Sequence, residues 1–153
     1  MAKGCMFCKI AKGKVPSYKI YENKKVIAFL DINPIAKGHT LVIPKKHFEN
    51  VFDCKDKILA EMIKATQKIA LHYKEKLGCT GVNILNASGA SAEQQVPHLH
   101  FHIIPRIEGD GHKLWPVTEH VTENLERLAE EIKMEDELET KKKKKTEENN
   151  DKK

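Results

Sequence analysis

Histidine alternates with apolar residues in the segment PHLHFHIIPR, residues 97–106. Side chains at alternate positions of a β-strand point to opposite faces, so His98, His100 and His102 are expected to line one face. The apolar residues between them, beginning with Leu99, would point the other way. The alternation therefore predicts a strand with one face in a core and the other face open to chemistry.

The remaining pattern supplies the partners of this strand. Apolar residues fall at helical spacing between positions 55 and 77, which predicts one long amphipathic helix. Short strands are expected at 17–21, 25–31, 41–43 and 81–86, and a charged helix at 119–138. Runs of neighbouring strands around one helix favour an α+β domain with an antiparallel sheet.

Charge is concentrated at the C-terminus. Residues 141–153 carry +4 of the formal net charge of +5, so the rest of the chain is nearly neutral. We expect one domain over residues 1–138, a disordered Lys-rich tail over 139–153, and no specific nucleic-acid surface. No apolar run approaches the roughly 18 residues of a membrane span, and no signal-peptide core is present. A cytoplasmic protein with reduced thiols and no membrane partner is the expectation.

Three alternating imidazoles have two chemical uses. They can bind a metal ion, or they can hold an anion with one ring acting as nucleophile or base. The polar, Gly-containing loop at 86–95 precedes them and offers backbone N–H groups together with the amides of Asn86 and Gln94. Such donors suit a phosphate better than a metal, although spacing alone leaves a trihistidine metal site open.

The segment HLHFHII, residues 98–104, matches the alternating signature of the histidine triad (HIT) superfamily. FCKI near the start, AFLDINPIAKGHTLVIPKKH at 28–47 and LWP at 114–116 resemble its Hint branch, and the resemblance spans residues 5–120. It implies a five-stranded antiparallel sheet with one long helix and a C-terminal helix. It also implies a homodimer in which two sheets join into one of ten strands.

The resemblance also implies roles for individual residues. His100 matches the nucleophile, His102 a donor to phosphate, His98 its other neighbour, and His39 a residue that orients the nucleophile. The implied nucleotide-binding residues are Ile10, Phe29 and Ile32 for the base, Asp31 for the ribose, Asn86 and Gln94 for phosphate and leaving group, and Trp115 for the partner subunit's site. Gln95 stands where animal relatives often carry serine, so the contact to the leaving group is expected to differ.

Cys5 and Cys8 form a Cys-x-x-Cys pair, which alone is a weak signal. Some microbial histidine triad proteins combine such a pair with two histidines that correspond here to His47 and His98. The resemblance therefore implies a structural Cys2His2 zinc site that leaves His100 free for chemistry.

The predicted activity is hydrolysis of purine nucleoside phosphoramidates, or nucleotidyl transfer from them, through a covalent nucleotidyl-histidine at His100, with no catalytic metal. A hydrolase of dinucleoside polyphosphates such as diadenosine tetraphosphate is the enzymatic alternative, because only the leaving group differs. A nucleotide-binding dimeric scaffold with vestigial activity and a trihistidine metalloenzyme are the alternatives from other classes.

Overall fold

The computed structural model describes residues 4–113 and 124–134. Its elements in chain order are α1 (Met6–Ala11), β1 (Lys19–Glu22), β2 (Val26–Leu30), β3 (Thr40–Pro44), α2 (Asp56–Leu77), β4 (Gly81–Leu85), a short 3₁₀ turn (Ala90–Ala92), β5 (Phe101–Arg106) and α3 (Leu125–Ile132). The α+β class and the five-stranded antiparallel sheet expected from the sequence are confirmed.

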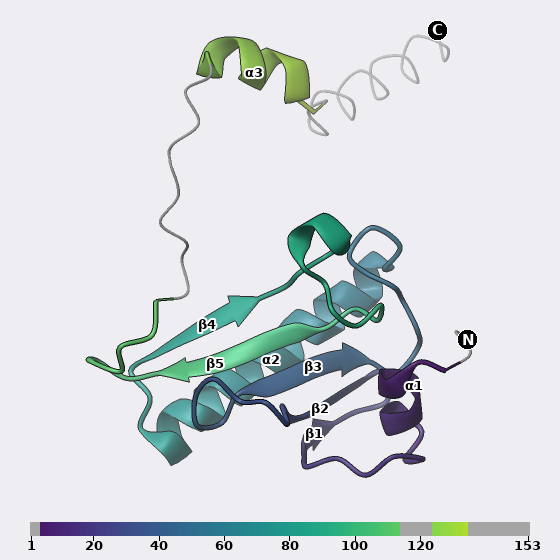
Figure 1. The fold of residues 1–153 in the computed structure, drawn as a ribbon, viewed down its shortest axis with the longest axis vertical. Helices are drawn as coiled ribbons and strands as arrows, with labels where there is room; N and C mark the ends of the chain where they lie inside the picture. Colours follow the sequence, from purple (N-terminus) through teal and green to yellow (C-terminus); the bar gives the residue numbers. More distant parts are fainter. Residues whose placement is uncertain (1–3, 114–123, 135–153) are drawn as a thin grey trace, which may run out of the picture. The chain divides into compact units, whose positions relative to one another are not determined.

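The sheet has the order β1-β2-β3-β5-β4, so β1 and β4 are its edges and β3 lies at its centre (Figure 1). β5 pairs with β3 on one side and with β4 on the other, and Leu85 lies opposite His102 while Gly81 lies opposite Arg106. The strand carrying the last triad histidine is therefore fixed from both sides.

Each face of the sheet has its own apolar core. On one face, Leu99, Phe101 and Ile103 pack with the buried residues of α2, including Met62 and Ile69. On the opposite face, α1 packs against strands β2 and β3. Burial on both sides explains why Val26 to Phe29 and Thr40 to Pro44 are continuously buried rather than alternating.

Two local features differ from the sequence-based expectations. Helix α1 was not predicted, because its single turn and a half is too short to show a helical period. Regular pairing of β5 begins at Phe101 rather than His98, because residues 96–98 form a bend.

The chain divides into two compact units, residues 1–114 and 115–153. The second contributes α3, whose start is capped by the Asn124 side chain accepting from the Arg127 backbone N–H at 3.0 Å. The predicted Lys-rich tail lies outside the described residues. None of the described helices is long and apolar enough to cross a membrane.

Candidate active site

His100 is buried with one ring nitrogen committed to the backbone. Its Nδ1 lies 2.7 Å from the carbonyl oxygen of His98, which can only accept, so Nδ1 carries the proton. In the neutral ring the lone pair is then on Nε2. Asn86 fixes the same residue from the other side, because its Nδ2 donates to the His100 carbonyl at 2.9 Å. The residue is held at both its ring and its backbone, with Nε2 left for reaction.

His102 is oriented by His39. The Ile35 backbone N–H donates to His39 Nδ1 at 3.3 Å, which leaves the proton of that neutral ring on Nε2. His39 Nε2 lies 2.9 Å from His102 Nδ1 and donates to it. His102 Nε2 therefore keeps its own proton and is a hydrogen-bond donor. The resemblance implied that His39 orients the nucleophile, but the ring it contacts is that of His102.

Burial keeps the triad rings neutral. It lowers the pKa of His98 and of His102 to about 4, with neighbouring histidines contributing, and it lowers the pKa of His100 and His39 as well. The Asp31 carboxylate, 3.7 Å from His39 Nε2, partly opposes the shift at His39. Neutral imidazoles are what both nucleophilic attack and metal ligation require.

An apolar slot opens beside the histidines on the same face of the sheet. It has a volume of about 290 Å³ and is lined by residues from α1, the segment before β1, β2, the segment after β2, and β3. Ile10, Phe29 and Ile32, which were predicted to hold a base, all line it. The Phe7 ring, which also lines the slot, lies edge-on to His100 with ring centroids 5.4 Å apart.

Asp31 follows β2 at the rim of this slot. Its Oδ1 accepts from the Asn33 backbone N–H at 2.9 Å, and its backbone N–H donates to the His39 carbonyl at 2.9 Å. The carboxylate is thus fixed near both the apolar slot and the imidazoles. This placement is compatible with the predicted role toward a ribose.

The predicted amides differ in what they contact. Gln94 donates to the carbonyls of Glu49 and Val96 and accepts from the Gly89 N–H, so it joins two loops. The implied contact of Gln94 with phosphate would require it to give up these bonds. Gln95 is exposed and makes no hydrogen bond to the described residues. Trp115 lies outside the described residues.

Four metal-ligating side chains converge next to the triad. Cys5, Cys8, His47 and His98 place their ligand atoms within 4.8 Å of one another. His98 Nε2 donates to the Pro44 carbonyl at 2.9 Å, so its Nδ1 lone pair faces the cluster. Nδ1 lies 3.2 Å from His47 Nδ1 and 3.4 and 3.6 Å from the sulfurs of Cys5 and Cys8.

These spacings suit one tetrahedral ion. Ordinary zinc bond lengths place two nitrogens about 3.3 Å apart and a nitrogen and a sulfur about 3.6 Å apart. By contrast, the three triad rings do not converge. His98 faces the cysteines, His100 its own backbone and His102 faces His39. The geometry therefore disfavours a trihistidine metal site and supports a Cys2His2 site.

Sequence reasoning missed two contributors to the site. Phe7 contacts the rings of both His98 and His100, and Tyr18 lines the apolar slot. Phe7 lies inside the Cys-x-x-Cys segment, and that position was the available signal. The Tyr18 contribution depends on how the chain enters β1 and has no local signature.

Comparison with known proteins gives consistent matches. The model of the HIT domain family matches residues 12–109. A relative from Methanocaldococcus jannaschii, described as an uncharacterized HIT-like protein, is 52% identical over 107 residues, covering 70% of this chain and 82% of that protein. The adenosine 5'-monophosphoramidase of Saccharomyces cerevisiae is 37% identical over 130 residues, covering 84% and 80%.

Solved structures agree with the fold. A HIT family member from Bacillus subtilis superposes with a TM-score of 0.77 at 41% identity, covering 88% of this chain and 99% of that one. A Zn-bound histidine triad family protein from Mycobacterium smegmatis has a TM-score of 0.71 at 39% identity, covering 72% and 81%.

Proposed function

The chain belongs to the histidine triad family, and from that premise we propose that it hydrolyses purine nucleoside phosphoramidates through a covalent intermediate on His100. One observation carries the proposal. The bond from His100 Nδ1 to the His98 carbonyl leaves the Nε2 lone pair of a buried, neutral imidazole as the reactive atom. The S. cerevisiae relative named as a monophosphoramidase supports the choice of leaving group.

In the proposed reaction, His100 Nε2 attacks the α-phosphorus and the P–N bond to the amine breaks. The leaving amine takes up a proton from solvent, and water then cleaves the new P–Nε2 bond, which releases a nucleoside monophosphate and returns a proton to solvent. His102 Nε2–H, oriented by His39, would donate to a phosphate oxygen on which charge develops. The apolar slot would hold the base and Asp31 would accept from the ribose hydroxyls.

Intact-protein mass spectrometry after a rapid acid-free quench tests this route. With an adenosine phosphoramidate, wild-type protein should gain the mass of one AMP, and His102→Ala should retain the adduct longer. His100→Ala should show neither adduct nor turnover while still binding AMP. Turnover by His100→Ala would refute the assignment of the nucleophile.

The leaving group has one competing candidate. Gln94 is occupied by backbone bonds, and Gln95 is exposed without a partner among the described residues, so neither selects an amine. A dinucleoside polyphosphate would place the same α-phosphate at His100. Comparing kcat/KM for an adenosine phosphoramidate and for diadenosine tetraphosphate separates the two activities, and we expect the phosphoramidate to be preferred.

The Cys2His2 cluster is proposed to hold structural zinc. Cys5, Cys8, His47 and His98 would be the ligands. The ion would join α1 to the segment that leads into β5 and would keep His98 and its carbonyl in place for His100. Burial raises the pKa of the Cys8 thiol when no metal is present, so a cation would be needed to stabilise its thiolate.

Metal analysis of protein purified without chelator tests the zinc proposal. Wild type should contain about one zinc per chain. Cys8→Ser should lose it, whereas Cys54→Ser should keep it because Cys54 lies outside the cluster. Wild-type protein without stoichiometric zinc would contradict the proposal.

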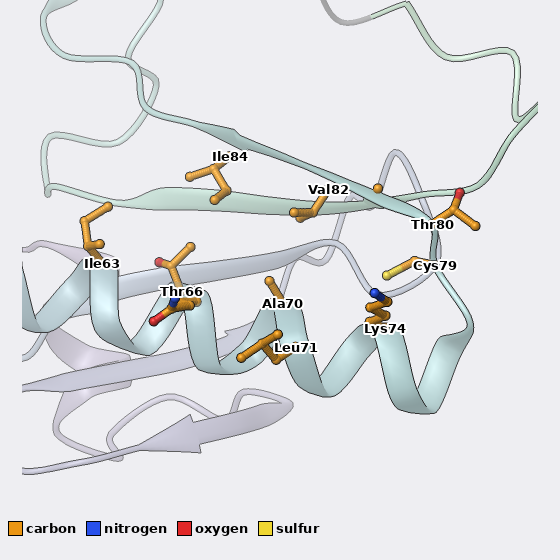
Figure 2. A pocket seen from close by; sticks show the side chains of 11 residues that line it. Ile63, Thr66, Ala70, Leu71, Lys74, Cys79, Thr80, Val82 and Ile84 are labelled. Carbon is orange, nitrogen blue, oxygen red and sulfur yellow. The ribbon is translucent and has the colours of Figure 1, made fainter.

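In the homodimer that we propose, β4 and α2 form the interface. β4 is an edge strand that exposes Val82, Ile84 and Leu85, and an apolar groove of about 350 Å³ runs between it and α2 (Figure 2). The Thr66 hydroxyl at this groove is buried without a hydrogen-bond partner among the described residues. A long apolar edge of this kind is normally covered.

Light scattering tests the dimer. Wild type should have twice the mass of one chain, and Ile84→Lys should give the monomer. Ile20→Lys is the matched control, since Ile20 is similarly exposed but lies on β1 at the opposite edge. A monomeric wild type, or a dimer that tolerates Ile84→Lys, would argue against this interface. The cytoplasmic location stays a prediction.

A further inference from the structure

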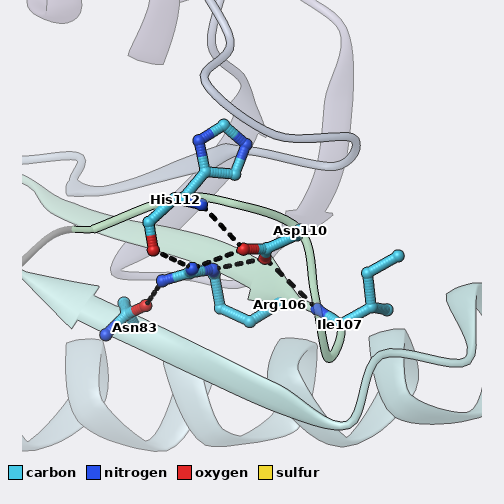
Figure 3. A network of polar contacts seen from close by, with 5 residues as sticks. All are labelled: Asn83, Arg106, Ile107, Asp110 and His112. Atoms are coloured by element: carbon cyan, nitrogen blue, oxygen red, sulfur yellow. Dashed lines mark hydrogen bonds and ion pairs between the residues drawn. The ribbon is translucent and has the colours of Figure 1, made fainter.

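A compact polar network fixes the chain where it leaves β5. The Arg106 guanidinium binds both oxygens of Asp110 through Nε and Nη2 at 2.6 Å, and its Nη1 donates to Asn83 Oδ1 on β4 at 2.6 Å (Figure 3). Nη2 also donates to the His112 carbonyl. We refer to Arg106, Asp110 and Asn83 as the clamp.

The clamp holds residues 107–113 in one defined loop conformation. Asp110 also accepts from the backbone N–H groups of Ile107 and His112, so one carboxylate organises the turn. Gly109 and Gly111 supply the left-handed φ angles of 78° and 76° that the turn requires. Bidentate arginine–carboxylate pairing fixes direction as well as distance. The activity proposed above uses none of these residues.

The clamp lies on the triad face of the sheet. Phe101 and Ile103 of β5 point into the α2 core, so His102 and Arg106 point to the other face. Asn83 is paired with Ile104 and lies on that same face. Arg106 is nevertheless four residues beyond His102, about 13 Å along the strand, and the chain then continues away from its own triad. Figure 1 shows β5 pointing away from α1 and the chain leaving at the opposite end of the sheet.

Within one subunit, the chain after Arg106 leads away from the triad. Two-fold pairing of the β4 edges makes it lead toward the partner's triad instead. Leu85 lies beside His102, and Gly81 lies beside Arg106. Antiparallel pairing of β4 with its copy brings the Gly81 end of one strand to the Leu85 end of the other. The axis is then perpendicular to the sheet, so both clamps and both triads share one face. The loop of one subunit therefore leaves β5 at the end of the joined sheet that carries its partner's triad.

We propose that the clamp is a positioning element that acts in trans: it holds residues 107–113 of one subunit beside its partner's triad, where they bound the space for the leaving group. Arg106 is thus a positioning residue for the partner's reaction. The proposal rests on the hydrolase activity and the β4-mediated dimer proposed above, and the test below separates its failure from theirs.

Mixed dimers distinguish action in trans from action in cis. A dimer of one His100→Ala and one Arg106→Ala subunit, isolated with two different affinity tags, contains one live nucleophile. In trans, that nucleophile faces the intact clamp of the His100→Ala subunit. In cis, it has only its own broken clamp. The reference is the mixed dimer of wild type with His100→Ala, which has one live nucleophile and an intact clamp in either case.

We expect the Arg106→Ala homodimer to lose about tenfold in kcat/KM for a phosphoramidate with a bulky amine, and less than about threefold for the unsubstituted amidate. A merely structural defect would reduce both equally. In the mixed dimer, turnover of the bulky substrate should return to within about twofold of the reference. As a control, Arg106→Ala mixed with Asp110→Asn should show no recovery, because each subunit then lacks one member of its clamp.

Three results would overturn the proposal: wild-type kinetics in the Arg106→Ala homodimer, equal losses for both amines, or a mixed dimer that stays at the Arg106→Ala level. If Arg106→Ala fails to fold or to dimerise, Asp110→Asn replaces it in the same mixing experiment. Wild-type protein that is dimeric but inactive on phosphoramidates refutes the proposed substrate, and the mixed-dimer comparison is then made with diadenosine tetraphosphate. A monomeric wild type refutes the interface and the action in trans, while the activity can still stand.

Discussion

Replacing Asn86 by Asp changes one group next to the proposed nucleophile His100: the side-chain NH2 becomes a carboxylate oxygen. The Asn86 amide donates from Nδ2 to the His100 carbonyl at 2.9 Å, and Ser88 Oγ donates to its Oδ1 at 2.7 Å. The Ser88 bond fixes which end of the amide faces His100. In Asn86→Asp, a carboxylate oxygen faces the carbonyl oxygen at the same distance, so a hydrogen bond becomes a repulsion between two acceptors.

The expected magnitude follows from that contact. A lost hydrogen bond contributes about 1 kcal/mol, and a partly buried carbonyl left without its donor adds about 1–3 kcal/mol. The free energy of unfolding should therefore fall by about 2–4 kcal/mol, and kcat should fall roughly 10- to 100-fold as His100 loses its fixed position. Urea unfolding and steady-state kinetics on an adenosine phosphoramidate measure the two effects.

Asn23→Asp is the matched control for this change. Asn23 Oδ1 accepts from the backbone N–H groups of Lys25 and Val26 at 2.8 Å, so an aspartate there keeps both bonds. The substitution introduces the same charge far from the triad. If Asn86→Asp matches this control in both unfolding free energy and kcat, the amide does not support His100 and the reasoning is refuted.

Two further predictions concern the other imidazoles. His39→Leu should lower kcat about tenfold because His102 loses the donor that sets its tautomer. His39→Gln can still donate to His102 and should retain most of the wild-type kcat. Equal kcat values in the two variants would contradict a role of the His39–His102 hydrogen bond. The pKa of His102 is lowered to about 4 in the folded state, so the unfolded chain binds a proton there first as pH falls below about 6.5. Stability is therefore present above pH 6.5 and falls toward pH 4, with a loss of up to about 2 kcal/mol from this group between pH 7 and pH 5. Urea unfolding of wild type and His102→Gln at both pH values measures this loss, and an equal loss in the two proteins would show that His102 does not titrate as its burial requires.

The triad segment shows how much a local pattern can predict. Alternation at residues 98–103 predicted which side chains enter the α2 core, and Leu99, Phe101 and Ile103 do so. The pattern could not predict where regular pairing begins, because this depends on β3 and β4, which lie far away in the sequence. Strand pairing is a property of neighbours, whereas the face on which a residue lies follows from period two alone.

For residues far from the triad in the sequence, local patterns predicted little and tertiary packing decided the contacts. Ile10, Phe29 and Ile32 were assigned to one slot through resemblance, and the structure brings them together from α1, β2 and the segment after β2. The partner of His39 and the backbone bonds of Gln94 could not be read from sequence. Both depend on which donor and acceptor come within about 3 Å after packing, and no spacing along the chain encodes that distance.

The sequence by itself determined the fold class, the long helix and the face that carries the histidines, because helical and strand periods act over a few residues. Only the tertiary structure decided which imidazole nitrogen is free, how closely the four expected zinc ligands approach one another, and how Arg106 fixes the chain after β5. Hydrogen bonds and ligand clusters require positions within tenths of an ångström. Those positions exist only after segments as far apart as Cys5 and His98 have packed against one sheet.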